Sequence, residues 1–314
     1  MFLNGLKNNE FLSYFFYLIL SVGFAVSVFY VNTLPNEYAL VDLSKFCFNS
    51  TVLYSVLFVV FWLLCIFWIH RLMTKYKILD LKGGLPIFLF VLFSFTFFKN
   101  GISLDILLSI LFLLFSFEQL IIIYQTQGRL YQSLNLGFLF GSAVFFYFPL
   151  ALLFPWLIMA LGIYKNLKWR DFILPLLGAL IPFYIYSTIC FFYHQPNILF
   201  TKMSLGYKFP NSLGLLVQKD FLFDFVLMIY FLVLFYSFKI KDTLTIKNRM
   251  FYNVLLLLFL GIVLLALFGA DSLVELSFLL LTITFLGAAY FNTYKKAWVF
   301  DVLMIAYWSI YFLS

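Results

Sequence analysis

The chain is poor in charged residues. Only 11% of its 314 residues are Asp, Glu, Lys or Arg, whereas an ordinary soluble domain carries roughly 25%. Hydrophobic residues make up 65% of the chain, and the mean hydropathy is +1.06. So few charged side chains cannot cover an aqueous surface, and the composition therefore excludes an ordinary soluble protein.

Residues that commonly carry metal and redox chemistry are also scarce. The chain has two histidines, His70 and His194, and three cysteines, Cys47, Cys65 and Cys190, without metal-site spacing. The sequence contains no P-loop, no G-x-S-x-G and no H-E-x-x-H motif. We therefore expect no metal and no cofactor, and two histidines exclude a multi-histidine iron site.

Apolar residues occur in blocks about as long as a bilayer is thick. The blocks cover 11–32, 51–69, 85–98, 103–124, 134–147, 149–163, 172–193, 221–238, 250–269, 276–293 and 298–313. Each is predicted to be a helix, because an open strand edge leaves backbone groups unpaired in hydrocarbon. The sequence predicts an all-α, polytopic transmembrane helix bundle of about 11 crossings, forming a single integral membrane domain over 1–314. The first block is expected to be a retained signal anchor, because no small-x-small cleavage site follows it.

The region 134–163 decides the number of crossings. One helix of 30 residues would measure about 45 Å, which exceeds the ~30 Å hydrocarbon core, and Pro149 would interrupt it. The alternative is a short re-entering helix pair at 134–163, joined near Tyr147-Phe148-Pro149.

The distribution of basic residues favours the helix pair. With the pair, one side of the membrane receives 15 of the 20 Lys and Arg residues and the other receives 5; with one long helix the numbers are 11 and 9. The positive-inside rule therefore predicts the pair, a cytoplasmic N-terminus and a periplasmic C-terminus in the bacterial inner membrane. This bias also accounts for the net charge of +7, so nucleic acid is not an expected partner.

Two predicted outward loops carry the candidate site residues. In the loop 33–50, Glu37 or Asp42 is a candidate catalytic base. In the segment 194–220, the candidate ligands of a lipid-linked phosphate are His194, Lys202, Tyr207 and Lys208. The alternative is that all of these side chains are solvated loop residues.

Two polar residues, Glu118 and Gln119, lie deep within the block 103–124. A charged side chain at mid-membrane costs about 2.5–3.5 kcal/mol on insertion scales, so it usually has a partner or a task. The candidate partners are Arg129 and Arg170. Three interpretations remain open: a structural ion pair, a proton or ion relay, and the wall of a polar cavity.

Gly137 and Gly141 form a G-x-x-x-G pattern at helical spacing. Small residues at this spacing allow two helices to approach closely. The pattern predicts tight internal packing of the short helix pair, with a dimer contact as the alternative.

The stretch from Glu118 to Pro182 resembles an uncharacterised family of polytopic bacterial inner-membrane proteins. The matching residues are Arg129, Asn135-x-Gly137-x3-Gly141, Tyr147-Phe148-Pro149, Trp169-Arg170-Asp171, Pro175, Gly178 and Pro182. Members of this family sometimes carry an automatic label of carotenoid monooxygenase, an activity that the two histidines of this chain do not support.

In layout the chain also looks like the membrane half of the GT-C glycosyltransferase superfamily. Enzymes of that superfamily have many crossings, a short re-entering helix pair and a catalytic acid in the first outward loop. The resemblance implies that Glu37 or Asp42 is this acid and that the partner is a membrane lipid such as polyprenyl phosphate.

Three functions therefore remain open. The first is a GT-C-like protein that handles a polyprenyl-linked sugar or envelope glycan precursor at the outer face. The second is a non-catalytic membrane subunit of a multiprotein envelope complex for secretion, motility or assembly, which the scarcity of catalytic candidates favours. The third is a small-molecule transporter.

Overall fold

The computed structural model describes residues 51–76, 84–99, 103–125, 130–164, 169–192, 245–268 and 277–293, together with Leu303 and Tyr307. The elements are α4 (Thr51–Tyr76), α5 (Leu85–Lys99), α6 (Leu104–Gln125), α7 (Leu130–Phe146), the 3-10 helix η2 (Phe148–Leu153), α8 (Phe154–Tyr164), α9 (Trp169–Phe192), α12 (Ile246–Phe268) and α14 (Leu279–Thr293). Within these ranges the chain is helical and has no strand, so the predicted all-α class is confirmed.

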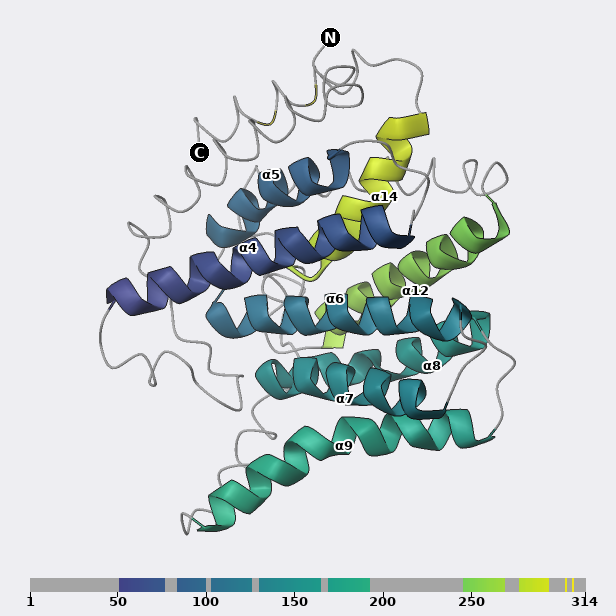
Figure 1. Cartoon of the computed structure of the whole chain (residues 1–314). Helices are drawn as coiled ribbons and strands as arrows, with labels where there is room; N and C mark the ends of the chain where they lie inside the picture. Colours follow the sequence, from purple (N-terminus) through teal and green to yellow (C-terminus); the bar gives the residue numbers. More distant parts are fainter. Residues whose placement is uncertain are drawn as a thin grey trace.

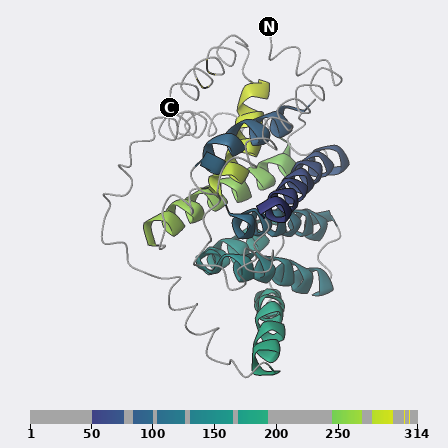
Figure 2. The same cartoon turned by 90° about the vertical axis from the view of Figure 1, so that its left-hand side faces the viewer.

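The helices pack side by side, and α6 lies at the centre. Figure 1 shows α5 and α14 at one edge of the bundle and α9 at the opposite edge. In the perpendicular view of Figure 2, α9 again lies at the edge of the bundle. The burial agrees with this arrangement, because 78% of the most apolar window of α6 is buried but only 11% of that of α9.

Four described helices, α4, α6, α9 and α12, are long and apolar enough to cross a membrane. The helices α5, α7, α8 and α14 are apolar but shorter. These lengths and compositions indicate a membrane protein. They give four candidate crossings rather than eleven, and the predicted blocks 11–32, 221–238 and most of 298–313 lie outside the described residues.

Several helices extend beyond the predicted apolar blocks, α4 and α12 among them. Helix α4 continues to Tyr76, past the predicted end at 69, and α12 begins at Ile246 rather than at 250. In the extension of α4, Leu72, Met73 and Tyr76 are buried. Hydropathy alone ended the block too early, because a helix continues through polar residues as long as one of its faces stays buried.

The region 134–163 is broken where the sequence predicts. Helix α7 ends at Phe146, Tyr147 is extended with φ −141° and ψ 96°, and Pro149 lies in the first turn of η2. Proline is tolerated there because the first amide groups of a helix have no intrahelical acceptor. The 3-10 helix itself was not predicted; it separates the two α-helices of the pair.

The chain then doubles back. The ring of Phe140 in α7 lies 6.2 Å from that of Phe154 and 6.5 Å from that of Trp156 in α8. In a single straight helix, 16 residues would separate Phe140 from Trp156 by about 24 Å. At the far end of α8, the ring of Tyr164 lies 5.6 Å from that of Tyr124 in α6. The predicted helix pair is therefore confirmed.

Helix α7 packs most extensively against α9, through glycines. A Cβ atom at Gly137 would collide with the backbone of Pro175, and one at Gly141 with the backbone of Ala179. On the facing helix, a Cβ atom at Gly178 would collide with the backbone carbonyl of Leu134. Both glycines of the G-x-x-x-G pattern therefore allow close packing within the chain, as expected, but the partner is α9 rather than the other helix of the short pair.

Buried hydroxyl groups are paired mostly within their own helices. Ser94, Ser116, Thr282 and Thr284 each donate to a backbone carbonyl three residues earlier. Such bonds let a polar side chain lie in an apolar interior. These residues therefore support the fold rather than a site.

Candidate functional site

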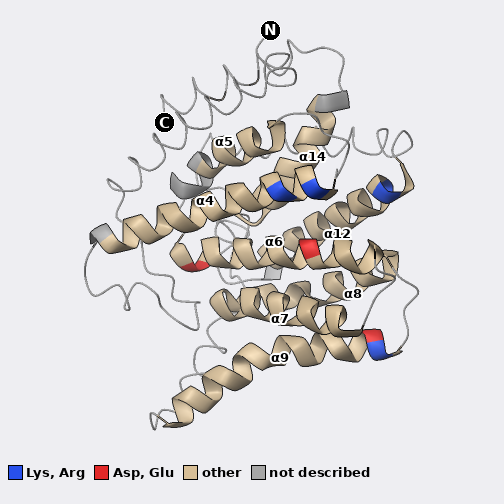
Figure 3. Ribbon diagram, viewed as in Figure 1, with Lys and Arg blue, Asp and Glu red and all other residues tan. Residues whose placement is uncertain are grey.

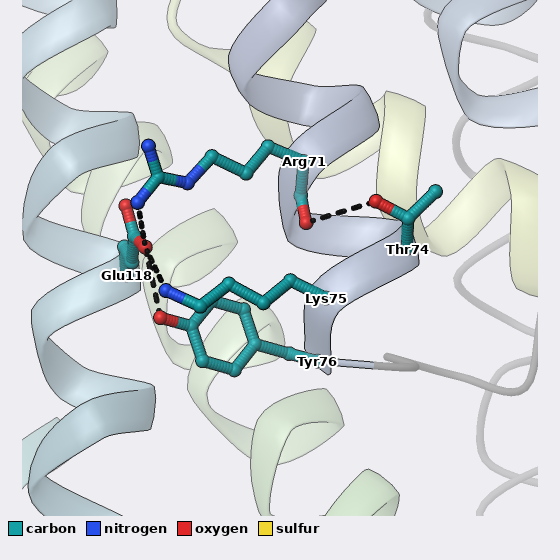
Figure 4. Close-up of polar contacts among 5 residues, drawn as sticks. All are labelled: Arg71, Thr74, Lys75, Tyr76 and Glu118. Carbon is teal, nitrogen blue, oxygen red and sulfur yellow. Dashed lines mark hydrogen bonds and ion pairs between the residues drawn. The ribbon is translucent and has the colours of Figure 1, made fainter.

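Glu118 of α6 is buried, and its carboxylate contacts three side chains of α4. The Nη2 atom of Arg71 lies 3.3 Å from its Oε1 atom, and the Nζ atom of Lys75 lies 3.4 Å from it. The hydroxyl of Tyr76 donates to the same oxygen at 2.8 Å. Figure 4 shows the three side chains converging on Glu118 from one face of α4.

The spacing on α4 explains this convergence. Arg71 and Lys75 are four residues apart and therefore lie on one face of a helix. The guanidinium of Arg71 also lies 4.4 Å above the ring centre of Trp68, whose ring is 4.3 Å from that of Phe115 in α6. Packing and charge thus hold Arg71 in one orientation.

A third helix joins at the same place. The ammonium group of Lys247, in the first turn of α12, donates to the backbone carbonyl of Tyr76. That carbonyl is among the last of α4, which have no intrahelical donor. We call Arg71, Lys75, Tyr76, Glu118 and Lys247 the Glu118 cluster; it contains three cationic groups and one carboxylate.

The prediction that Glu118 forms a structural ion pair agrees with this geometry, but its partners on α4 are residues that the sequence did not indicate. Arg170 lies at the start of α9 with its guanidinium 5.5 Å from the ring centre of Trp169. Helix α7 packs against both α6 and α9 and separates them. Arg129 lies outside the described residues. The missed signal was the basic pair Arg71 and Lys75, which lies on α4 rather than in a loop.

Of the remaining predicted site residues, Gln119 alone is among those that the structure describes. Gln119 is partly buried on α6. Glu37 and Asp42 of the first loop lie outside the described residues, as do the predicted phosphate ligands His194, Lys202, Tyr207 and Lys208. Their roles therefore stay predictions.

The described ranges contain no group of three or more His, Cys, Asp or Glu side chains that could hold a metal ion. The two cysteines in these ranges, Cys65 and Cys190, are buried and form no disulfide. The part of the chain seen here therefore offers an ion-pair cluster and no metal centre.

Basic side chains gather at one end of the bundle. In Figure 3 the ribbon is blue, the colour of Lys and Arg, near the end of α4 and at the beginnings of α9 and α12. These residues are Arg71, Lys75, Arg170, Lys247 and Arg249. The sequence assigned all five to the same side of the membrane, and their common location agrees with that assignment.

An apolar groove lies in the opposite half of the bundle, between α7, η2, the start of α8 and α9. Its volume is about 270 Å³. The lining includes Gly141, Val144, Phe148, Ala151, Phe154 and Phe183, and every lining residue is apolar. The groove lies beside the turn of the re-entering helix pair.

No protein-family model, curated protein or solved structure matches this chain. The resemblances of the sequence to an inner-membrane family and to the GT-C superfamily therefore stay predictions, and function is inferred from the chain's own residues.

Proposed function

We propose that the chain is a polytopic, GT-C-like protein of the bacterial inner membrane that handles a polyprenyl-linked sugar or envelope glycan precursor at the outer face. The observation that carries this proposal is the wholly apolar groove beside the turn between α7 and α8. It offers a hydrocarbon chain a place within the bundle, next to where the proposal puts the outward loops.

The groove suits part of a lipid tail. Its volume of about 270 Å³ is close to the lower end of the range for small-molecule sites, roughly 300–1,000 Å³. Aromatic and small side chains, such as Phe148, Phe183 and Gly141, line it without a polar group. Such a lining binds hydrocarbon and excludes the phosphate, which must therefore lie at the rim.

The proposal includes eleven crossings, a cytoplasmic N-terminus and a periplasmic C-terminus. The gathering of described basic side chains at one end of the bundle supports this orientation, because Lys and Arg are enriched at the cytoplasmic side. The groove lies in the other half, and in this orientation it faces the outer leaflet.

In this proposal the outward loops supply the chemistry. Glu37 or Asp42 acts as the base that accepts a proton from an acceptor hydroxyl. Lys202 and Lys208, with His194 and Tyr207, hold the lipid-linked phosphate through charge-assisted hydrogen bonds.

The test is native mass spectrometry of the full chain after mild solubilisation. We expect a retained polyprenyl phosphate on the wild-type protein. Ala151→Trp, which fills the groove, should remove it. Val60→Trp, on an exposed position of α4 outside the groove, should retain it. A wild-type protein that binds no added polyprenyl phosphate would contradict the proposal.

A second candidate is the non-catalytic subunit of an envelope complex. The exposed face of α9 favours it, because large apolar side chains such as Tyr184, Phe191 and Phe192 are each at least 70% exposed there. A protein partner retained in the same spectra, without a polyprenyl lipid, would favour this candidate over the first.

A transporter has less support. A transporter would be expected to have a polar cavity at the bilayer midplane around Glu118, but the carboxylate is engaged by Arg71, Lys75 and Tyr76.

A further inference from the structure

The Glu118 cluster carries more positive than negative charge. Arg71 and Lys75 contact the Glu118 carboxylate, and Lys247 joins the cluster through the backbone carbonyl of Tyr76; Glu118 is the one carboxylate that these contacts include among the described residues. The surplus of two positive charges exceeds the partial negative charge at the end of α4, roughly half a unit. Ion pairing within the cluster therefore neutralises only part of its positive charge.

The two cations of α4 are held in place and remain accessible. The side chain of Glu118 is 6% exposed, whereas those of Arg71 and Lys75 are 39% and 51% exposed. Of the nitrogen atoms of Arg71, only Nη2 forms an ion pair with a described residue. The other nitrogens of the guanidinium carry further N–H donors. Because both cations contact one carboxylate oxygen, they lie close enough to bind one further anion together.

The cluster lies at the level expected for lipid headgroups. Helix α4 has 26 residues and measures about 39 Å, longer than the ~30 Å hydrocarbon core. Arg71 and Lys75 lie in its last two turns. Trp68, one turn earlier, is of a residue type enriched at the membrane interface.

We propose that Arg71 and Lys75 form a binding site for the phosphate of an anionic membrane lipid headgroup. Glu118 and Trp68 position the two cations, and the acyl chains lie along the exposed apolar side chains of α4, which include Leu63, Leu64 and Phe67. Basic pockets between transmembrane helices on the cytoplasmic side commonly bind such headgroups. This site is independent of the apolar groove and lies in the other half of the bundle.

The experiment measures lipid binding to the full chain in detergent. Phosphatidylglycerol is titrated against phosphatidylcholine of the same acyl chains, and bound lipids are counted by native mass spectrometry. We expect the wild-type protein to prefer phosphatidylglycerol. The triple variant Arg71→Gln, Lys75→Gln, Glu118→Gln should bind it at least about tenfold more weakly.

The triple variant removes both cations together with the carboxylate, so no buried charge is left without a partner. Arg170→Gln is the matched control, because it removes the same net charge from the same end of the bundle; we expect less than about a threefold change. A second variant, Glu118→Gln, keeps both cations but loses the carboxylate that positions them, so it should weaken phosphatidylglycerol binding less than the triple variant does.

Two results would overturn the proposal. One is an unchanged preference for phosphatidylglycerol in a folded triple variant. The other is equal thermal stabilisation of the wild type by inorganic phosphate and by phosphatidylglycerol at the same concentration, because the site would then bind a free phosphate rather than a lipid.

Discussion

At the scale of single residues, the Glu118 carboxylate is the main polar feature of the described bundle. Glu118 is only 4% exposed, and it lies in α6, the most buried of the four candidate spanning helices. An isolated charge there would be costly. Three hydrogen-bonding or ionic contacts to one oxygen offset that cost. Its first task is therefore to join α4 to α6.

Tyr76→Phe should lower the free energy of unfolding by about 1.5–3 kcal/mol, the typical contribution of a hydrogen bond to a charged group. The hydroxyl of Tyr76 donates to Glu118 at 2.8 Å, and the variant keeps the ring. Equilibrium unfolding in mixed micelles measures the change. Tyr184→Phe, at a side chain that is 74% exposed, is the control and should have little effect.

Arg71→Gln and Glu118→Gln should show non-additive effects. The two side chains are in direct contact, and interacting pairs give coupling energies of about 0.5–3 kcal/mol. Because Arg71 is partly exposed, we expect a value of about 1 kcal/mol. A double-mutant cycle on unfolding free energies measures it.

The cycle of Glu118→Gln with Arg170→Gln is the comparison and should be additive within about 0.5 kcal/mol. Equal coupling energies in both cycles would mean that Arg170 also interacts with Glu118, as the sequence indicated.

At the scale of elements, the pair α7 and α9 depends on glycine. In lipid, helix association rests on close packing rather than on the hydrophobic effect. Gly137 and Gly141 meet the segment from Pro175 to Ala179 backbone to backbone. This contact holds α9, the least buried of the four candidate spanning helices, on the bundle.

Gly178→Ala should destabilise the protein by about 1–3 kcal/mol, the usual cost of overpacking. The added methyl group would meet the backbone of α7, which cannot move aside without separating the helices. Thermal unfolding in detergent measures the loss.

Gly287→Ala is the matched control. There the new Cβ would approach only the Cδ1 atom of Leu89, at 3.3 Å, and a side-chain end can shift. The gain in helix propensity, about 1 kcal/mol, should make this variant neutral or slightly stabilising. A loss as large as that of Gly178→Ala would contradict the assigned role of the α7–α9 contact.

At the scale of the whole molecule, the re-entering pair decides at which end of the bundle α9 begins. Because α8 returns beside α7, the contact between Tyr124 and Tyr164 brings the ends of α6 and α8 together. The bond from Lys247 to the end of α4 brings the beginning of α12 to the same end of the bundle. One long helix over 134–163 would have sent the basic residues after it to the opposite side.

Compartment-sensitive reporters fused to the two ends of the chain should report different compartments: the N-terminus in the cytoplasm and the C-terminus in the periplasm. This outcome is what the proposed arrangement of eleven crossings, with most positive residues in the cytoplasm, requires. A reporter inserted after Tyr164 should give a cytoplasmic signal. Matching signals from the two ends would contradict eleven crossings.

The sequence was sufficient for the features that depend on local chemistry. Scarce charge and long apolar blocks indicated helices in lipid, and Pro149 indicated a break because proline cannot continue a helix. Gly137 and Gly141 indicated a close helix contact because they lack a Cβ atom. The unequal distribution of Lys and Arg indicated that basic residues distant in sequence lie at the same end of the bundle.

Only the tertiary structure decided which side chains meet. Hydropathy ended the block of α4 before Arg71 and Lys75, so the sequence reading assigned Glu118 to Arg129 and Arg170 instead. The choice depends on which helix faces α6, and the packing places α4 there and α7 between α6 and α9. The apolar groove likewise exists only because the turn after α7 and the face of α9 come together. Such contacts join distant segments through shape, which no local pattern of residues specifies.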